Sequence, residues 1–327
     1  LPRFPLRISP AALAQGLGVL LSQLSAPVLE AYPHRCTTAD LSPAELRQAL
    51  RQITGVILSC PSHFSADYRS HLLQAVLHTG IVSQSSQIIF LEEPIAALFS
   101  QAPLPVGEVL VVHGGYSRTE IGLFNLPQGA THPSLISLNC GQLALTQGVI
   151  RELLYPLLPQ TDPHRSALET FHLPALSPFA NWAIDEVQTL FQTQTQHWQL
   201  EQAPLGKILI QAAARLQTTF DTQSQFSLRI GQQTHIVPAS DWQRCILSPY
   251  QRWIEQGIHS VLERNALSPE AIEYVVTTGS LSHRPWFRAI LQPLFPHTQF
   301  LEVPRVESPL AVGFGLAKFP LYGAIVS

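Results

Sequence analysis

The stretch that most constrains this chain runs from Val106 to Gln128 and reads VGEVLVVHGGYSRTEIGLFNLPQ. Val109 to Val112 is apolar and mostly β-branched, Gly114-Gly115 marks a tight turn, and Ile121 to Phe124 returns as a largely apolar run. This pattern predicts two buried strands joined by a glycine turn. Such a turn brings backbone N–H groups against a phosphate in some proteins and is an ordinary hairpin in others. The stretch alone leaves both interpretations open.

Strands and helices alternate on either side of this stretch. Before it, apolar strands at 56–58 and 88–91 are each followed by a helical pattern, at 65–79 and 95–101. This β–α–β–α order predicts an α/β unit whose strands are buried on both faces. The other expected elements are helices at 9–25, 43–53, 143–158, 181–193, 208–220, 285–294 and 308–317, strands at 135–138, 274–278 and 300–303, and a hairpin of 226–230 with 233–237. A long helical region is expected to begin within 238–241 and to run to 265, either unbroken or interrupted near 248–249.

Composition excludes several classes of function. The net charge of −3 gives no electrostatic footprint for nucleic acid or an anionic membrane, and no apolar run reaches the ~18 residues that span a bilayer. Cys36, Cys60, Cys140 and Cys245 are too scattered for a metal clip or a redox pair, which suits a reducing cytoplasm. The first 25 residues lack the pattern of a signal peptide. We therefore expect a cytoplasmic protein without a membrane span and without a nucleic-acid partner.

Five short motifs stand in a fixed order along the chain. They are CPSHF at 60–64 with Arg69 eight residues after its proline, LEEPIAA at 91–97, HGGYSRTE at 113–120, VVTTGS at 275–280 and ESPLAVG at 307–313. In order and spacing they resemble motifs of the nucleotide-binding domain of DnaK-type heat-shock chaperones, within the actin-like ATPase superfamily. The family motifs are Val-Pro-Ala-Tyr-Phe, Asn-Glu-Pro-Thr-Ala-Ala, Asp-Leu-Gly-Gly-Gly-Thr-Phe-Asp, Val-Leu-Val-Gly-Gly-Ser and Asp-Glu-Ala-Val-Ala-Tyr-Gly. The resemblance covers nearly all of residues 8–320.

The resemblance implies an α/β actin-like ATPase fold of two lobes, with the first lobe incomplete. Residues 1–104 would be the remainder of lobe I. Segments 105–155 and 248–320 would form the base subdomain of lobe II, 156–247 its upper subdomain, and 321–327 a tail. The implied ligands are ATP or ADP with Mg²⁺, and the implied partners are protein clients or co-chaperones.

The resemblance also assigns roles to individual residues. Glu93 falls where the family has a glutamate near the Mg²⁺ and the attacking water. Pro61 and Arg69 match a Pro–Arg pair that relays the nucleotide state between domains. The implied nucleotide-binding residues are Gly114, Gly115, Tyr116, Ser117, Arg118, Gly279 and Ser280, and no residue is assigned as a metal ligand. From the sequence alone, Glu93 can instead be a carboxylate that favours a helix N-terminus, and Gly279-Ser280 is a strand-to-helix turn whether or not it borders a nucleotide.

The chain departs from the family at the positions that carry the chemistry. It begins with Leu1 and contains no methionine, so we expect a longer protein, and the first phosphate loop and the catalytic lysine would precede Leu1. His113 replaces an aspartate, and neutral imidazole cannot supply negative charge to Mg²⁺. Tyr116 and Ser117 replace glycines, whose lack of a Cβ lets backbone approach phosphate. Arg118 replaces a threonine and could instead present its charge to a phosphate.

The adenosine side is eroded as well. The family's clasp helix carries Glu, Lys, Arg and Ser around the ribose and base, whereas three of the matching positions here hold Ala214, Gln217 and Thr218. Two functions follow from these observations. The first is a chaperone-like or scaffolding module with a degenerate ATP-binding cleft and weak or no hydrolysis. The second is an ATP-hydrolysing chaperone domain whose missing N-terminal segment completes the site.

Overall fold

A computed structural model describes residues 52–62, 66–101, 103–126, 133–158, 204–230, 232–303 and 311–322, with isolated residues 15, 16, 19, 42, 44, 45 and 48. The chain divides into two compact units, one of residues 1–60 and 64–91 and one of residues 61–63 and 92–327. Residues 15, 16 and 19 are helical, as are 44, 45 and 48, and the rest of the helices expected at 9–25 and 43–53 lies almost wholly outside the described residues. The helix expected at 181–193 also lies outside them.

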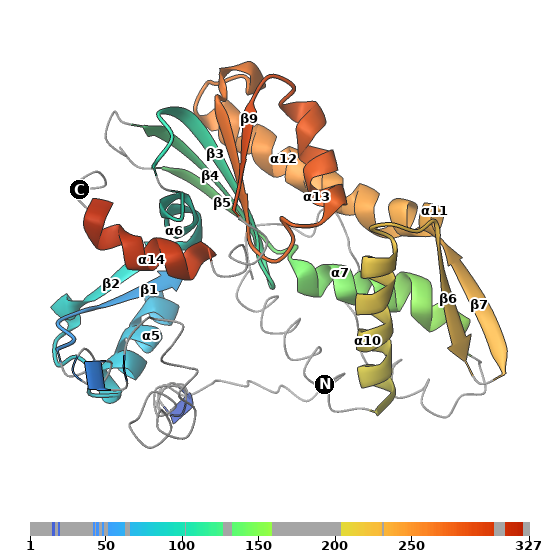
Figure 1. The fold of residues 1–327 in the computed structure, drawn as a ribbon, viewed down its shortest axis with the longest axis horizontal. Helices are drawn as coiled ribbons and strands as arrows, with labels where there is room; N and C mark the ends of the chain where they lie inside the picture. Colours follow the sequence, from blue (N-terminus) through green and yellow to red (C-terminus); the bar gives the residue numbers. More distant parts are fainter. Residues whose placement is uncertain are drawn as a thin grey trace. The chain divides into compact units, whose positions relative to one another are not determined.

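The first unit pairs two short strands beside one helix. Strands β1 (Val56–Cys60) and β2 (Ile88–Glu92) form a two-stranded sheet, and α5 (Ala66–His78) lies between them in sequence (Figure 1). A 3₁₀ turn (Ser85–Gln87) leads into β2. The small core of this unit consists of Val76, Val82 and Ile88, with Leu58 and Leu73 packed against it. These elements agree with the strand–helix–strand order predicted from the sequence.

A mixed five-stranded sheet organises the second unit. In space the strands follow the order β5 (Ser134–Leu138), β4 (Thr119–Leu126), β3 (Gly107–Gly114), β8 (Tyr274–Thr278) and β9 (Gln299–Glu302). Strand β4 is antiparallel to both β3 and β5, whereas β8 and β9 continue the sheet parallel to β3. The strands predicted around the glycine turn and at 274–278 are therefore neighbours, and the predicted α/β class is confirmed.

Helices cover both faces of this sheet (Figure 1). Helix α12 (Ser248–Arg264) lies on one face, where a Cβ on Gly257 would come within 2.9 Å of Ile121. Helix α6 (Glu93–Phe99) lies on the other face, where a Cβ on Gly122 would come within 2.9 Å of the Pro94 Cβ. Because strand side chains alternate between faces, residues 110, 112, 121 and 136 point toward α12, and residues 113, 120 and 122 point toward α6.

Helix α14 (Ala311–Tyr322) packs along α6. The helices approach so closely at Gly315 that any Cβ there would collide with the Ala96 carbonyl group. Phe319 meets Phe99 edge to face at 5.5 Å between ring centroids, and the Lys318 ammonium donates to the Ser100 carbonyl at 2.9 Å. The predicted end of this helix at residue 317 was wrong, because residues 318 and 319 extend the contact with α6.

The remaining elements of the second unit adjoin the sheet through one apolar core. Helix α7 (Gln142–Val149) continues through a π-helical stretch (Ile150–Leu154) and a 3₁₀ turn (Tyr155–Leu157), and it packs against α10 (Pro204–Thr219). Hairpin strands β6 (Gln225–Ile230) and β7 (Gln233–Pro238) follow, then α11 (Ala239–Trp242) and a π-helical stretch (Gln243–Leu247) that leads into α12. The 3₁₀ turn Pro269–Ala271 precedes β8, and α13 (Pro285–Leu291) ends in the 3₁₀ turn Gln292–Leu294.

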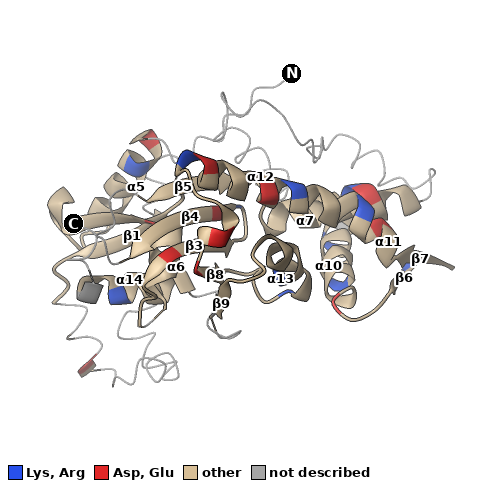
Figure 2. Ribbon diagram, turned by 90° about the horizontal axis from the view of Figure 1, so that it is seen from above, with Lys and Arg blue, Asp and Glu red and all other residues tan. Residues whose placement is uncertain are grey.

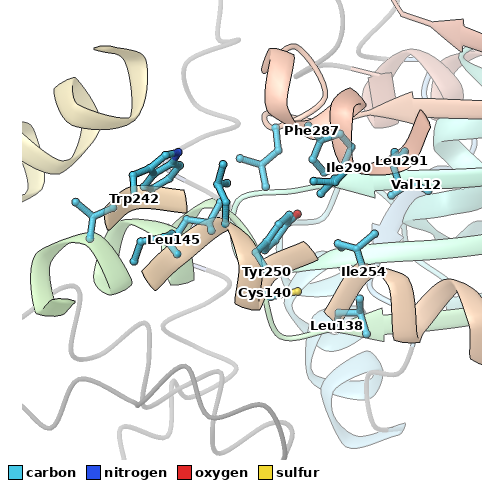
Figure 3. Close-up of a cluster of buried hydrophobic side chains, with 14 of the residues drawn as sticks. Val112, Leu138, Cys140, Leu145, Trp242, Tyr250, Ile254, Phe287, Ile290 and Leu291 are labelled. Carbon is cyan, nitrogen blue, oxygen red and sulfur yellow. The ribbon is translucent and has the colours of Figure 1, made fainter. Parts of the chain in front are cut away.

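Aromatic side chains fill the centre of that core (Figure 3). Tyr250 lies edge to face with Trp286 at 5.7 Å, and Trp286 contacts Trp242 at 6.3 Å between ring centroids. Acidic and basic residues are interspersed along the helical stretch that runs from α11 into α12 (Figure 2). Within the described ranges, no helix has both the length and the apolar character that crossing a membrane requires.

Candidate functional site

The β3–β4 turn is held firmly from within and from α7. The Gly115 N–H donates to the Arg118 carbonyl at 2.8 Å, which closes the turn. The first amides of α7 then donate to the turn, from Gln142 to the Gly115 carbonyl at 3.1 Å and from Leu143 to the Tyr116 carbonyl at 2.8 Å. A Cβ at Gly141 would lie 2.5 Å from the Arg118 nitrogen, so this close approach requires glycine. The turn therefore occupies N–H groups that a helix N-terminus could otherwise offer to an anion.

The second glycine motif meets the first at the carboxyl ends of β3 and β8. Gly279 has φ of +90° and lies so close to Gly114 that a Cβ would sit 2.4 Å from the Gly114 oxygen. The same oxygen accepts the Leu281 N–H at 3.0 Å and the Ser280 hydroxyl at 3.4 Å. These contacts join two segments that are far apart in the sequence, since Gly114 and Ser280 are separated by 166 positions. Carboxyl ends of neighbouring parallel strands are the usual location of ligand sites in α/β sheets.

A row of polar side chains crosses the α6-facing side of the sheet at this end. Register places Ser137 of β5 opposite Glu120 of β4, Glu120 opposite His113 of β3, and His113 opposite Thr278 of β8. All four are buried. The His113 Nδ1 lies 2.9 Å from the Thr278 Oγ1, which fixes the orientation of the ring.

Two further side chains, those of Arg118 and Glu93, extend this row of polar residues. The Arg118 side chain is 3% exposed and donates from Nη1 to the Ser137 hydroxyl at 3.0 Å. Glu93, at the first position of α6, places its Oε2 3.7 Å from the His113 Nε2. We call Glu93, His113, Arg118 and Glu120 the polar cluster.

Burial dominates the protonation of the polar cluster. It lowers the pKa of His113 to about 4, so the imidazole is neutral near pH 7 and its contact with Glu93 is not an ion pair. Burial raises the pKa of Glu93, against the opposing effect of the Arg118 charge. The pKa of Glu120 rises to about 8, first through burial and then through the Glu93 charge, although Ser62, Ser137 and Arg118 favour its ionised form.

The segment after β1 also reaches the cluster. The Ser62 N–H donates to the Glu120 Oε1 at 2.9 Å, and the Ser62 hydroxyl donates to its Oε2 at 3.3 Å. Pro61 belongs with Ser62 to the second unit, whereas Arg69 lies half-buried on α5 of the first unit. A relay role for Pro61 and Arg69 stays a prediction.

The opposite face of β4 is tied to the core by a second set of hydrogen bonds. The Thr119 hydroxyl donates to the Cys140 carbonyl at 2.6 Å and so accepts from the Tyr250 hydroxyl at 2.9 Å. Tyr250 and Cys140 lie side by side in Figure 3. Burial raises the pKa of the Cys140 thiol to about 12, so this cysteine is an inert core residue.

The predicted site residues thus come together only in part. Gly114, Gly279 and Ser280 are in direct contact, and Glu93 and Arg118 belong to the same buried cluster. Tyr116 instead points outward and is 55% exposed. The sequence analysis missed Glu120 and the side chains that contact it, Ser62 and Ser137. A signal for Glu120 existed, because a carboxylate inside an otherwise apolar strand needs a partner.

A separate ion pair links α10 to the turn before α13. The Arg284 Nη1 donates to the Asp221 Oδ2 at 2.6 Å, and the two side chains are 11% and 17% exposed. Asp221 follows the end of α10 by two residues. Across the described part of the chain, no three His, Cys, Asp or Glu side chains are grouped so that they could hold a metal ion.

Comparison with known proteins adds no family to this description. No family model matches the chain, and no curated protein matches it either.

Proposed function

We propose that the chain is a divergent relative of the DnaK-type nucleotide-binding domain, with a two-lobed actin-like fold and a degenerate ATP-binding cleft. In this proposal it is a chaperone-like or scaffolding module that binds ATP or ADP weakly or not at all and hydrolyses little or none. The chaperone-like role rests on the resemblance of the sequence motifs. The state of the cleft rests on the geometry of the polar cluster.

The arrangement of the sheet supports the first part of this proposal. All five strands of the mixed sheet fall inside the segments 105–155 and 248–320. These segments were expected to form one base subdomain from the motif order alone. The contact of Gly114 with Gly279 and Ser280 also brings the expected phosphate-side and adenosine-side turns to one end of one sheet.

Burial of the Arg118 guanidinium carries the second part. A phosphate group needs N–H donors or positive charge that it can reach. The Arg118 side chain is 3% exposed, already donates to Ser137, and favours the ionised forms of Glu93 and Glu120 through its charge. The neighbouring α7 amides are used by the Gly115 and Tyr116 carbonyls. The Arg118 Nη1 and the first amides of α7 are therefore engaged inside the protein, and efficient phosphoryl transfer depends on groups that can reach the phosphate.

The test is calorimetric titration of the protein with Mg-ATP, combined with a phosphate-release assay. We expect no saturable binding at about 1 mM ATP, a level at which even a Kd near 1 mM, or about −4 kcal/mol, would be visible. A DnaK-type nucleotide-binding domain measured in the same buffer is the positive control. Micromolar binding together with phosphate release would instead support the working ATPase.

The chaperone-like role has its own test. We expect the protein to reduce aggregation of a heat-denatured model client, with the same efficiency in the presence and absence of Mg-ATP. An inert globular protein at equal mass concentration is the control. Aggregation equal to that control would contradict the chaperone-like role and leave a scaffold without client binding.

A further inference from the structure

The polar cluster contains more negative than positive groups. Glu93 and Glu120 are two carboxyl groups, Arg118 is a single cation, and the buried His113 ring is neutral near pH 7. With both carboxyl groups ionised, the cluster would carry a net charge of −1 inside the protein. A buried charge without compensation is strongly unfavourable, and the protein avoids it by keeping a proton. With the His113 ring neutral, the charges of this cluster thus require one exchangeable proton on a carboxyl group.

The proton belongs on Glu120 rather than on Glu93. Glu120 is 0% exposed, whereas the Glu93 side chain is 26% exposed and retains some solvation when ionised. The groups that face Glu120 come from each neighbouring element. They are His113 of β3, Ser137 of β5, Glu93 of α6, Arg118 of the turn and Ser62 of the segment after β1.

We propose that the polar cluster is a proton-controlled latch, in which one proton on Glu120 keeps the cluster neutral and holds the first turn of α6 against the sheet, and in which loss of that proton in mildly alkaline solution loosens this turn. The loosening follows from repulsion. Once ionised, Glu120 and Glu93 share one guanidinium, and Glu93 is the group that can move toward water because it begins a helix. This proposal concerns proton binding and holds whether or not the cleft binds nucleotide.

The direction of the pH dependence follows from linkage. The pKa of Glu120 is about 8 in the folded protein, against an ordinary value of 4.5 in the unfolded chain. Between these values the folded state binds more protons than the unfolded state, so stability falls as the pH rises through this range. About one pH unit above this pKa, Glu120 is ionised in both states, so the loss is complete and stability no longer changes with pH through this group.

The Glu120→Gln variant tests the latch. Glutamine has nearly the same shape, keeps an oxygen that can accept the Ser62 N–H, and cannot ionise. We expect the urea midpoint of the wild type to fall between about pH 6 and about pH 8.5, and the midpoint of the variant to stay level over this range. Glu263→Gln on the exposed side of α12, 68% exposed, is the matched control and should follow the wild type. Parallel profiles for the wild type and Glu120→Gln would overturn the proposal.

A second measurement does not depend on a variant that folds. Infrared spectra of the wild type should contain the carbonyl stretch of a protonated carboxyl group at about pH 7, and the band should vanish by about pH 9.5. Over the same range, hydrogen exchange of α6 amides should accelerate about tenfold relative to α12 amides, which serve as the reference for the intrinsic effect of pH. Absence of the protonated carboxyl band at neutral pH would refute the latch, whatever the behaviour of the variant.

Discussion

Two buried groups of charges in the second unit differ in one respect that decides their behaviour. The Asp221–Arg284 pair matches one carboxylate with one guanidinium at 2.6 Å. The polar cluster sets Arg118 against both Glu93 and Glu120. Both regions are largely shielded from water, and both connect segments that are far apart in the sequence. Their charge ratio is what separates them.

The ratio of carboxyl groups to guanidinium groups determines which of the two regions responds to pH. A matched pair of one carboxylate and one guanidinium is neutral as a unit. A two-to-one cluster is neutral only with a bound proton, so its stability is linked to pH. The Asp221–Arg284 pair therefore acts as a fixed structural tie, and the polar cluster acts as the responsive element. The following variants are designed to separate these two behaviours.

The largest effect should come from Arg118→Met, which removes the only cation of the polar cluster. The two carboxyl groups then lack a compensating cation, and we expect a loss of about 3–5 kcal/mol in unfolding free energy at about pH 8. The loss should shrink at about pH 5, because both carboxyl groups can become neutral by protonation. Urea unfolding followed by circular dichroism at the two pH values measures this difference.

Two further variants control the Arg118 experiment. Arg252→Met removes an exposed arginine from α12 and should change stability by less than about 0.5 kcal/mol. Arg118→Lys keeps the positive charge but lacks the planar guanidinium, so its stability should lie between that of the wild type and that of Arg118→Met. An equal loss at both pH values for Arg118→Met would mean that the arginine matters for packing, as its long stem allows, and not for charge.

The outline of the fold could be predicted from the sequence for identifiable reasons. Strand β3 ends in Gly114 and strand β8 is followed directly by Gly279, and both contain β-branched runs; this pattern has few alternatives in an α/β chain. The turn motif at Gly114 and the motif at Gly279 were expected to share one site, and the two glycines are in contact. A positive φ at Gly279 explains why that position holds glycine.

The polar cluster could not be predicted in the same way, because its members come from separate elements. Glu120 meets Ser62, which is 58 positions away, and the Asp221–Arg284 pair spans 63 positions. Strand alternation places Glu120 on one face of β4, but it does not say which helix covers that face. That α6 covers it follows from close packing at Gly122 and Pro94. Partner choice is a property of the packed structure and leaves no local pattern.

The next largest effect should come from the matched pair, and it should depend on whether one or both members are removed. Arg284→Met leaves Asp221 buried without its cation and should cost about 3 kcal/mol. The double variant Asp221→Leu with Arg284→Met removes both charges together and should recover most of that loss, since buried matched pairs are often replaceable by apolar residues. A thermodynamic cycle of the four proteins at about pH 7 gives the coupling energy.

The same cycle at about pH 9 sharpens the contrast between the regions. The coupling energy of Asp221 and Arg284 should be unchanged there, whereas the cost of Arg118→Met should have grown. A coupling energy for the matched pair that varied with pH as strongly as the polar cluster would contradict the distinction between a fixed tie and a responsive element. So would a double variant as unstable as Arg284→Met alone.

The smallest effect concerns His113 and lies on the acid side. The pKa of His113 is about 4 in the folded protein and 6.5 in the unfolded chain, so the unfolded state binds more protons between these values. Stability from this residue is complete above about pH 6.5 and is lost as the pH falls toward about 4, at a cost of about 2 kcal/mol after local relaxation. Glu120 changes the stability in the opposite direction over most of this range, because protonation of Glu120 favours the folded state.

The measurement is therefore made in the Glu120→Gln background, with urea unfolding from about pH 7 to about pH 4. Adding His113→Gln should flatten the acid limb, while His259→Gln on α12, 73% exposed, should leave it in place. If stability still fell at low pH after the His113→Gln substitution, the groups responsible would lie outside the polar cluster. The cluster would then affect stability on the alkaline side alone.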